Sequence, residues 1–477
     1  MGLVFTQEQQ QVIDLRNCNI LVSAAAGSGK TAVLVERIIQ RLTKEEPRLD
    51  VDQLLIVTFT EAAASEMKER IQVAIEKALE EQPDNVHLQR QATLIHQAQI
   101  TTIHTFCLSV IREYFHTIDL DPGFRVAEPG ELELFKRDVL ENVLETAYEN
   151  ATPEFVEFVE SFAFGKNDRI LETLILQLHE FAESYPNPSK WLDSCIQQYK
   201  IATPEELEQR SFVQEIVAEM TGIFEDMRQQ IAYAIEICES EEGPFAYIDA
   251  LQEDLSILEA LTELKQFDAI GELIRKVQWK ALGRHRKTDI VSLEKTQQVR
   301  AIRDEMKNAI KMVQEQYCLE PLVVVHQEMQ QAGEHVKVLV DLVQMFSKAF
   351  TEEKRKKNII DFDDMEHYAL AILTEEKDGQ LIPSEVAERY QNHFVEVMID
   401  EYQDSNFLQE AIMTSVSKVS QGRYNMFMVG DVKQSIYSFR LARPELFMEK
   451  FHTYSMEEGE RRRIDLHKNF RSRKEVL

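Results

Sequence analysis

Short apolar runs rich in β-branched residues recur in two distant parts of this chain. Each run is followed by polar, glycine-containing or helical sequence, and the runs are Ile20 to Val22, Leu54 to Phe59, Ile100 to Ile103, Val395 to Ile399 and Met426 to Val429. Strands that are buried on both faces read as continuous apolar segments. The pattern therefore predicts the parallel strands of an α/β domain, in one group before about residue 115 and another after about residue 390.

Between these groups, residues 116–350 show helical periodicity with acidic surface positions and little glycine or proline. Apolar residues at helical spacing predict amphipathic helices, for example over Leu132 to Tyr148, Phe212 to Cys238 and Val336 to Phe350. We therefore expect one α/β domain in two pieces, 1–115 and 351–477, interrupted by an all-α insertion over 116–350. The expected exit and return are marked by Pro122-Gly123, Glu128 to Gly130 and Ile359 to Asp364.

The composition of the 477 residues, 44% hydrophobic and 29% charged, is typical of a globular protein. A net charge of −30 argues against adhesion to nucleic acid over the whole surface, but it is compatible with a local track. Basic clusters at Arg275 to Lys287, Lys354 to Lys357 and Arg461 to Arg463 are more typical of solvated helix faces than of nucleic-acid sites. No apolar run is long enough to span a membrane, so we expect no membrane partner and a cytoplasmic location. The five cysteines lack zinc spacing and are expected to be reduced, mostly buried thiols.

A glycine-bearing loop stands between the first predicted strand and a helical stretch that begins at Ala32. The residues of this motif are Ala24, Ala25, Ala26, Gly27, Ser28, Gly29, Lys30 and Thr31. A strand, a glycine loop and a helix start form the context in which backbone N–H groups cradle phosphates. The Lys30 ammonium suits the β- and γ-phosphates, and the Thr31 hydroxyl suits Mg²⁺. The loop predicts a nucleotide site, although Ala24 replaces the usual first glycine.

An acidic pair, Asp400 and Glu401, follows the predicted strand that ends at Ile399. In a P-loop fold this position suits metal coordination by Asp400 and activation of the attacking water by Glu401. An exposed acidic turn is the alternative. Beyond the next predicted strand, Gln434 can touch both the γ-phosphate and the nucleic-acid side. Near the end of the chain, Phe470 is suited to stack on adenine and Arg471 to stabilise charge on the transferring phosphoryl group.

In this order the motifs resemble those of a superfamily-one DNA helicase of the UvrD/RecB type. The matching segments are Phe5 to Gln9, Ala24 to Thr31, Thr58 to Thr60, Asp400 to Asp404, Gln434 to Tyr437 and Asn469 to Ser472. Within that superfamily, Val22 to Ala26, Ala32 to Ile38 and Ser184 to Pro188 resemble the AddA family of helicase–nuclease subunits. The resemblance implies a RecA-like P-loop motor domain and ATP-dependent, 3′-to-5′ DNA unwinding in double-strand-break repair and homologous recombination. It implies ATP and Mg²⁺ as cofactors, and the implied partners are single-stranded DNA, duplex ends and an AddB-like subunit.

The resemblance also implies roles for residues around the nucleotide. Gln9 would read the adenine edge, and the motif from Ala24 to Thr31 would hold the phosphates. Thr31 and Asp400 would bind Mg²⁺, while Glu401 would accept the proton of the attacking water. The last assignments are γ-phosphate contacts for Gln434 and Arg471, and adenine stacking by Phe470 from one side, since Ala32 replaces an arginine often found there.

Three segments would contact the DNA strand by the same resemblance. They are Thr58-Phe59-Thr60, the segment with Thr102, His104 and Phe106, and the segment with Tyr437, Phe439 and Arg440. A base stacked on an aromatic ring gains about 1–3 kcal/mol, and hydroxyl groups hold phosphates without reading sequence. Core packing is the alternative for each aromatic residue. For His104 we expect a DNA contact, and for the cluster from Asp361 to His367 a helix start, rather than a metal site.

The resemblance covers nearly all 477 residues, but the second motor domain and the C-terminal nuclease of AddA proteins have no counterpart in them. We therefore expect weak ATP binding and slow hydrolysis by this chain. Two other interpretations stay open: a UvrD/PcrA-like repair helicase without a nuclease, and an ATP-gated DNA-binding module that does not unwind. The segment from Ser184 to Pro188 weighs against the first, and the paired acids weigh against the second.

Overall fold

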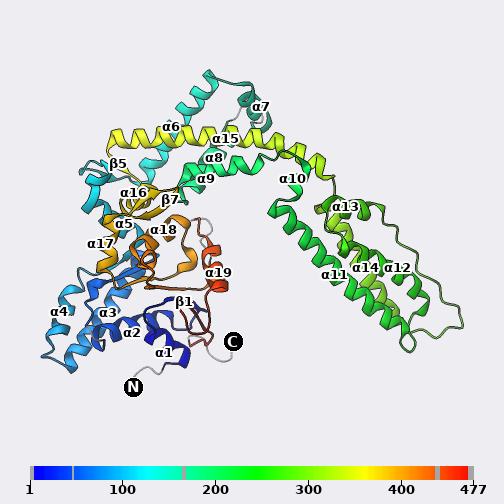
Figure 1. Cartoon of the computed structure of the whole chain (residues 1–477), viewed down its shortest axis with the longest axis horizontal. Helices are drawn as coiled ribbons and strands as arrows, with labels where there is room; N and C mark the ends of the chain where they lie inside the picture. Colours follow the sequence, from blue (N-terminus) through cyan, green and yellow to red (C-terminus); the bar gives the residue numbers. More distant parts are fainter. Residues whose placement is uncertain (1–4, 46–47, 164–167, 436–440, 471–477) are drawn as a thin grey trace. The chain divides into compact units, whose positions relative to one another are not determined.

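A six-stranded, wholly parallel β-sheet organises the fold (Figure 1). The computed structural model describes residues 5–45, 48–163, 168–435 and 441–470. In the order β10-β1-β9-β8-β2-β3, the strands are β10 (Arg461–Leu466), β1 (Asn19–Ala24), β9 (Met426–Gly430), β8 (Glu396–Ile399), β2 (Leu54–Thr58) and β3 (Gln99–Thr102). The α/β class and the predicted parallel strands are confirmed.

The edge strand β10 was not predicted, because its sequence begins with three arginines. Arg461, Arg462 and Arg463 pair with the first residues of β1, so this cluster does not form a helix face. The Arg463 guanidinium lies 3.9 Å from the ring centroid of Phe451 and forms an ion pair with Asp465 at 3.2 Å. An edge strand has one side without a neighbour, which is why charged residues are tolerated there.

Helices cover both faces of the sheet, because successive strand residues point to opposite sides. On β2, Leu54 and Ile56 belong to one core, while Leu55 and Val57 belong to the other. The helices of the first face are α1 (Gln7–Asp14), α2 (Lys30–Thr43), α3 (Glu61–Glu81) and α4 (Val86–Leu94). Those of the second are α5 (Ile103–Tyr114), α16 (Phe362–Leu373), α17 (Glu385–His393), α18 (Phe407–Val416) and α19 (Pro444–Thr453).

Side-chain caps fix where several of these helices begin. Asp361 and Asp364 form a capping box at the start of α16, which confirms the helix start predicted for this cluster. Thr60 accepts a hydrogen bond from a backbone N–H at the start of α3, and Thr102 does the same at the start of α5. Such a cap stabilises a helix by about 1 kcal/mol. Two threonines expected to touch DNA therefore also have a structural role.

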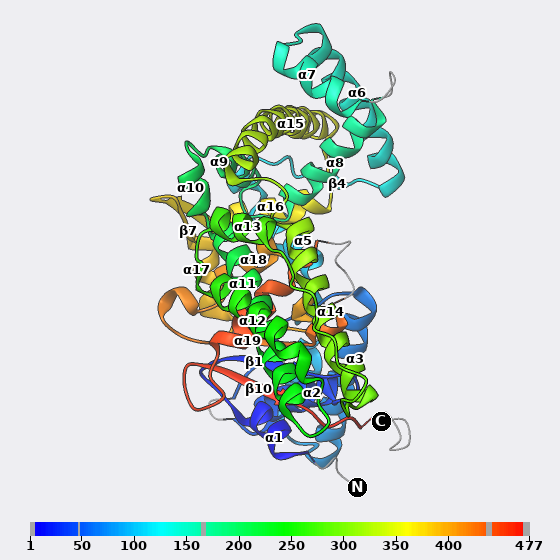
Figure 2. The same cartoon turned by 90° about the vertical axis from the view of Figure 1, so that its right-hand side faces the viewer.

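The chain divides into two compact units, each with its own core. Unit 1 comprises Met1–Thr152, Val159–Leu192 and Asp341–Leu477 and contains the sheet, while unit 2 comprises Pro153–Phe158 and Asp193–Val340. In unit 2, α11 (Ser211–Glu239), α12 (Ile248–Glu263) and α14 (Leu293–Gln316) lie side by side (Figure 1 and Figure 2). The remaining helices are α6 (Pro129–Glu149), α7 (Pro153–Phe162), α8 (Arg169–Glu183), α9 (Pro188–Tyr199), α10 (Pro204–Glu208), α13 (Phe267–Lys276) and α15 (Leu322–Lys357). The predicted helices within 132–148, 212–238 and 336–350 are confirmed, and the division at 115 and 350 stays a prediction.

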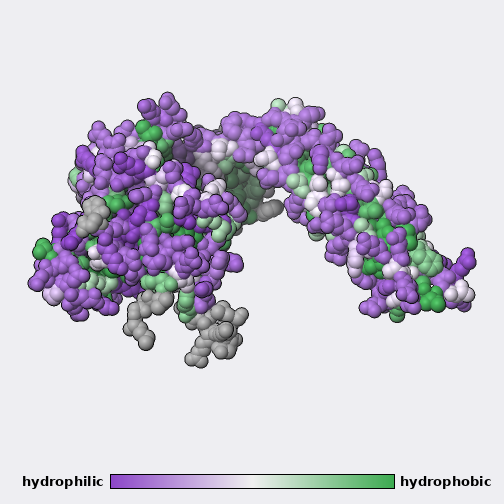
Figure 3. Space-filling model, turned by 60° about the horizontal axis from the view of Figure 1, so that its bottom comes forward, coloured by the Kyte–Doolittle hydropathy of each residue, from purple (hydrophilic) through white to green (hydrophobic). Residues whose placement is uncertain are grey.

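The expected exit and return of the insertion lie next to each other. There, β4 (Arg125–Val126) pairs in parallel with β5 (Ile359–Ile360). A hairpin of β6 (Thr374–Lys377) and β7 (Gln380–Pro383) follows α16. Hydrophilic residues cover most of the face in Figure 3, in keeping with the net charge of −30. Four of the five cysteines are buried, as predicted, and none of the helices described combines the length and apolar character that crossing a bilayer requires.

Candidate functional site

The loop between β1 and α2 has a left-handed backbone at both of its glycines. Gly27 has φ of 77° and Gly29 has φ of 84°, values that residues with a Cβ rarely adopt. Gly29 is the N-cap of α2, so Lys30 and Thr31 are the first residues of that helix. Free N–H groups and the helix dipole make such a start favourable for an anion. The loop therefore offers an anion-binding geometry.

Lys30 contacts one of the paired acids, although 371 positions separate the two residues. Its Nζ lies 3.2 Å from Oε2 of Glu401 and 3.4 Å from Oε1. Glu401 has φ of 53°, and this left-handed residue turns the chain sharply after β8. The carboxyl ends of parallel strands meet at one edge of a sheet, which brings the loop after β1 close to the acids after β8.

Asp400, the other acid of the pair, carries an unfavourable charge. Burial raises the pKa of Asp400 to about 6, the charge of Glu401 raises it as well, and Lys30 offsets part of this effect. A carboxylate in this state is stabilised by a nearby cation. The described part of the chain contains no group of three or more His, Cys, Asp and Glu residues that could hold a metal. A metal at Asp400 would therefore need oxygen ligands from a bound molecule or water, which is usual for Mg²⁺.

Hydrogen bonds connect the end of β9 with the paired acids. Gln434 Nε2 donates to Asp431 Oδ2 at 2.5 Å, and the Asp431 N–H donates to Gln403 Oε1 at 3.0 Å. Gln403 Nε2 then donates to Glu401 Oε2 at 2.9 Å. Gln434 and Glu401 were predicted from sequence as site residues, whereas Gln403 and Asp431 were missed. The position of Gln403 inside the acidic motif was the available signal.

Gln9 and Phe470 lie at the other side of the glycine loop. Gln9 is buried, and its amide accepts from the Thr6 N–H and donates to the Ser28 carbonyl, both at 2.9 Å. One N–H and one lone pair of that amide remain for a ligand. The Phe470 N–H donates to the Gly27 carbonyl at 2.8 Å, and Phe470 is 58% exposed. Both residues line one pocket, together with Thr6, Glu8, Ser28, Leu466, His467 and Lys468.

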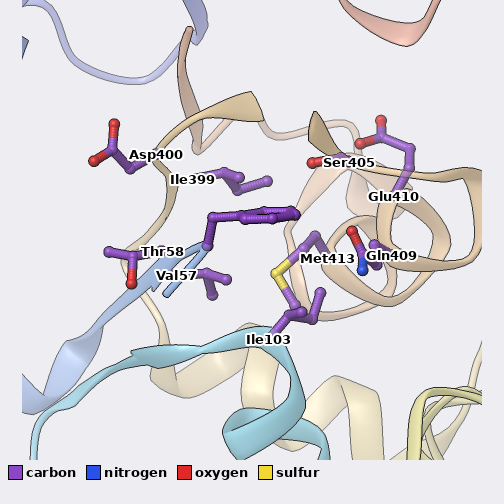
Figure 4. A pocket seen from close by; sticks show the side chains of 10 residues that line it. Val57, Thr58, Ile103, Ile399, Asp400, Ser405, Gln409, Glu410 and Met413 are labelled. Carbon is purple, nitrogen blue, oxygen red and sulfur yellow. The ribbon is translucent and has the colours of Figure 1, made fainter. Parts of the chain in front are cut away.

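A second pocket lies at the ends of β2 and β8 (Figure 4). It is lined by Val57, Thr58, Phe59, Ile103, Ile399, Asp400, Ser405, Gln409, Glu410 and Met413. Phe59 is half-buried, Thr60 is exposed, and the buried Thr58 donates its hydroxyl to the Thr60 carbonyl. The segment Thr58-Phe59-Thr60 thus combines an accessible aromatic residue with a fixed backbone at the sheet edge.

The segment after β3 fits the expected DNA contact only in part. Thr102 is buried and hydrogen-bonds to Glu61, whereas His104 is partly exposed, pairs with Glu366 at 3.2 Å and packs edge-on against Phe362. Phe106 is 0% exposed and belongs to a core of unit 1, so it has no ring face for a base. The expectation of stacking by Phe106 was therefore wrong, and core packing explains this residue.

Other expectations fall outside the described residues or change in the structure. Tyr437, Phe439, Arg440 and Arg471 lie outside the described residues. Lys354, placed by sequence on a solvated basic face, is instead buried between Asp361 and Asp364, at 2.8 and 2.7 Å.

The fold and the site define a class of protein. Residues 5–455 match the family model described as the UvrD/REP helicase N-terminal domain, and the chain belongs to this family. The match spans the loop after β1, the paired acids after β8 and the end of β9.

Curated relatives give a finer comparison. The chain is 48% identical to the ATP-dependent helicase/nuclease subunit (AddA) of Lachnoclostridium phytofermentans, over 99% of this chain and 35% of the relative. It is 43% identical to the protein of that name from Clostridium beijerinckii, over 99% of this chain and 38% of the relative. For Bacillus cytotoxicus the identity is 44%, over 100% of this chain and 39% of the relative. The chain thus spans little more than a third of these relatives' length.

Proposed function

We propose that this chain is the N-terminal motor part of an AddA-like, ATP-dependent 3′-to-5′ DNA helicase–nuclease that acts in double-strand-break repair and homologous recombination. The observation that carries the proposal is the 3.2 Å contact between Lys30 and Glu401 at the sheet edge that holds the glycine loop. The similarity to helicase/nuclease subunits over 99% or more of the chain supports it. Because the chain spans at most 39% of these relatives, the unwinding and nuclease activities of a whole protein belong to the proposal.

The proposed fold is a P-loop, RecA-like motor domain formed by 1–115 and 351–477, with 116–350 as its helical insertion. The parallel sheet supports this assignment, as do the left-handed glycines of the loop and the position of the acids after β8. Single-stranded DNA, duplex ends and an AddB-like subunit are the proposed partners.

In the proposed ATPase, residues of this chain hold the phosphates and move one proton. ATP supplies the phosphoryl group, and a divalent metal, Mg²⁺ in this proposal, neutralises charge on it. The loop N–H groups and Lys30 would bind phosphate oxygens, and Thr31 and Asp400 would hold the metal. The raised pKa of Asp400, about 6, supports a cation at this position. Glu401 would accept the proton of the attacking water.

The remaining site residues would bind the two ends of the nucleotide. The free N–H and lone pair of the Gln9 amide suit the adenine edge, and the exposed ring of Phe470 suits stacking on the base. Gln434 would face the γ-phosphate. Arg471 stays a prediction of the same kind, at the opposite side of the phosphoryl group.

The proposed DNA track follows the same edge of the sheet. Thr58, Phe59 and Thr60 come after β2, and Thr102 and His104 come after the neighbouring strand β3. Phe59 would stack on a base, while hydroxyl groups would hold phosphates without reading sequence. Nucleotide and DNA would therefore contact adjacent strand ends of one rigid sheet.

ATP hydrolysis by the purified 477-residue chain, with and without oligo(dT), tests the proposal. We expect slow, Mg²⁺-dependent hydrolysis, which falls about 100-fold or more in Glu401→Gln because the proton acceptor is lost. Lys30→Ala should weaken nucleotide binding, since the phosphates lose a cation. Glu66→Gln is the control, because Glu66 pairs with Arg70 on the exposed face of α3, away from the glycine loop and the paired acids.

The outcomes separate the three interpretations. Hydrolysis by Lys30→Ala at the unaltered rate would contradict a P-loop ATPase. DNA binding without any hydrolysis above the Glu401→Gln level would favour the ATP-gated binding module. Rapid DNA-stimulated turnover would contradict the expected slow hydrolysis by this chain.

A further inference from the structure

Gln403 occupies the junction between the paired acids and the end of β9. It lies in the short 3-10 helix Tyr402–Asp404 and is 1% exposed. Its Nε2 donates to Glu401 Oε2 at 2.9 Å and to Asp404 Oδ2 at 3.1 Å. Its Oε1 accepts from the Asp431 N–H at 3.0 Å. Both ends of this buried amide are therefore used, and they connect two different strand ends.

The chemistry of the partners fixes the orientation of the Gln403 amide. A backbone N–H can only donate, so the Gln403 oxygen must face Asp431. The charged carboxylates can only accept, so the Gln403 nitrogen must face Glu401 and Asp404. The opposite orientation would set donor against donor and acceptor against acceptor. The amide is therefore a directional link and holds the Glu401 carboxylate from one side.

Gly430 leaves the space that this link requires. A Cβ added at Gly430 would lie 2.3 Å from Gln403 Oε1 and 3.1 Å from Phe447 Cε2. The first distance is far inside van der Waals contact, so any larger residue at this position would displace the Gln403 amide. The last residue of β9 and the amide of Gln403 are thus fitted to each other.

Side-chain contacts from Lys30 and Gln403 hold the Glu401 carboxylate. In the proposed ATPase, Lys30 moves its charge to the phosphates, which leaves Gln403 as the side chain that orients Glu401. We propose that Gln403 is a positioning residue, which aims the Glu401 carboxylate at the attacking water and ties it to the end of β9 that carries Gln434. This inference rests on the proposed ATPase function.

The decisive variant is Gln403→Met, which keeps the length of the side chain but removes its hydrogen bonds. Gln391→Met is the matched control, because Gln391 is also 1% exposed and its amide bonds to Ser415 and Gln421 far from the acids. With protein in excess over γ-labelled ATP, we expect Gln403→Met to hydrolyse about 10- to 100-fold more slowly, as a misaligned proton acceptor should. The dissociation constant for ATPγS should stay within about 3-fold, since Gln403 is not expected to touch the nucleotide. A structural role alone would lower the bound fraction instead.

Gly430→Ala is a second, independent variant. It leaves the Gln403 amide intact but displaces it, and should slow the hydrolysis of bound ATP in the same way. In the double variant the two losses should not multiply, because both act through one link. Rates are compared per molecule of bound ATPγS, so that unfolded protein does not count.

Each result decides between the proposals. Equal rates for Gln403→Met and the Gln391→Met control would overturn the positioning role, and so would a multiplied loss in the double variant. If Glu401→Gln is inactive while Gln403→Met is unaffected, only the role of Gln403 fails. If Glu401→Gln hydrolyses ATP normally, the proposed ATPase itself fails.

Discussion

A buried ion triad connects the helix that begins with Lys30 to the strand that ends before the paired acids. Glu396, the first residue of β8, is 3% exposed and lies 2.6 Å from both Arg37 and Arg41 of α2. The Arg37 guanidinium also lies 4.9 Å from the ring centroid of Phe427 on β9. We predict that Glu396→Gln destabilises unit 1, because it leaves two buried guanidinium groups with no compensating charge.

The expected loss can be worked out from the structure in two ways. Breaking a buried ion pair by removing one partner typically costs about 3–5 kcal/mol. Burial raises the pKa of Glu396, but the two arginines outweigh burial and lower it from 4.5 to about 2. A difference of about 2.5 units corresponds to about 3 kcal/mol. Burial lowers the pKa of Arg37 despite the attraction of Glu396, so the lower end of the range, about 3 kcal/mol, is the expected value.

Tryptophan fluorescence can follow unit 1 separately. The chain has two tryptophans, Trp191 in unit 1 and Trp279 in unit 2. In a Trp279→Phe background, a urea titration followed by Trp191 therefore reports on unit 1, where Trp191 stacks on Tyr185. Glu66→Gln is the control and should change the unfolding free energy by at most about 0.5 kcal/mol, since exposed ion pairs contribute little.

The same assay tests the pH dependence. Because folding lowers the pKa of Glu396, its stabilising contribution is complete above pH 4.5 and is lost as the pH falls toward 2. The difference between the unaltered chain and Glu396→Gln should therefore persist from pH 7 to 4.5 and shrink below that. A difference under about 1 kcal/mol at pH 7, or one that grows on acidification, would refute the reasoning.

Phe470→Ala is expected to raise the dissociation constant for ATPγS about 10-fold in calorimetry, through the loss of a stacking face, and unchanged affinity would contradict this. Phe59→Ala should weaken oligo(dT) binding about 10-fold in fluorescence anisotropy, whereas equal binding would remove Phe59 from the DNA track. Lys354→Met leaves Asp361 and Asp364 buried without a cation, and should lower the unfolding free energy in the Trp191 titration by about 3–5 kcal/mol. A loss below about 1 kcal/mol would show that the carboxylates relax without it.

Prediction from sequence worked best where local pattern and burial agree. β2 is apolar at consecutive positions because Leu54 and Leu55 face different cores, so a run of apolar residues identifies it. The proximity of Lys30 and Glu401 was also predictable, since the ends of parallel strands meet at one edge even when hundreds of residues separate them.

The rest depended on tertiary context. Three arginines conceal β10, because an edge strand needs only part of its residues to be apolar. The burial of Lys354 requires Asp361, which stands only seven positions away but becomes a neighbour through the turn after α15. Phe106 was within reach of sequence analysis, since Ile103, Phe106 and Val110 have the spacing of a buried helix face. The motif resemblance outweighed that pattern.

The position of β1 inside the sheet has a consequence for synthesis of the protein. Ile20 pairs with Phe427 on one side and with Arg462 on the other, so both neighbours of β1 leave the ribosome long after it does. At about 5–20 residues per second, the interval is roughly 20–90 s. Throughout that time an apolar segment has no sheet to join, while the helices of unit 2 can already assemble from contiguous chain. The glycine loop therefore reaches its final shape among the last parts of the molecule, which makes the nascent N-terminus a natural client for chaperones.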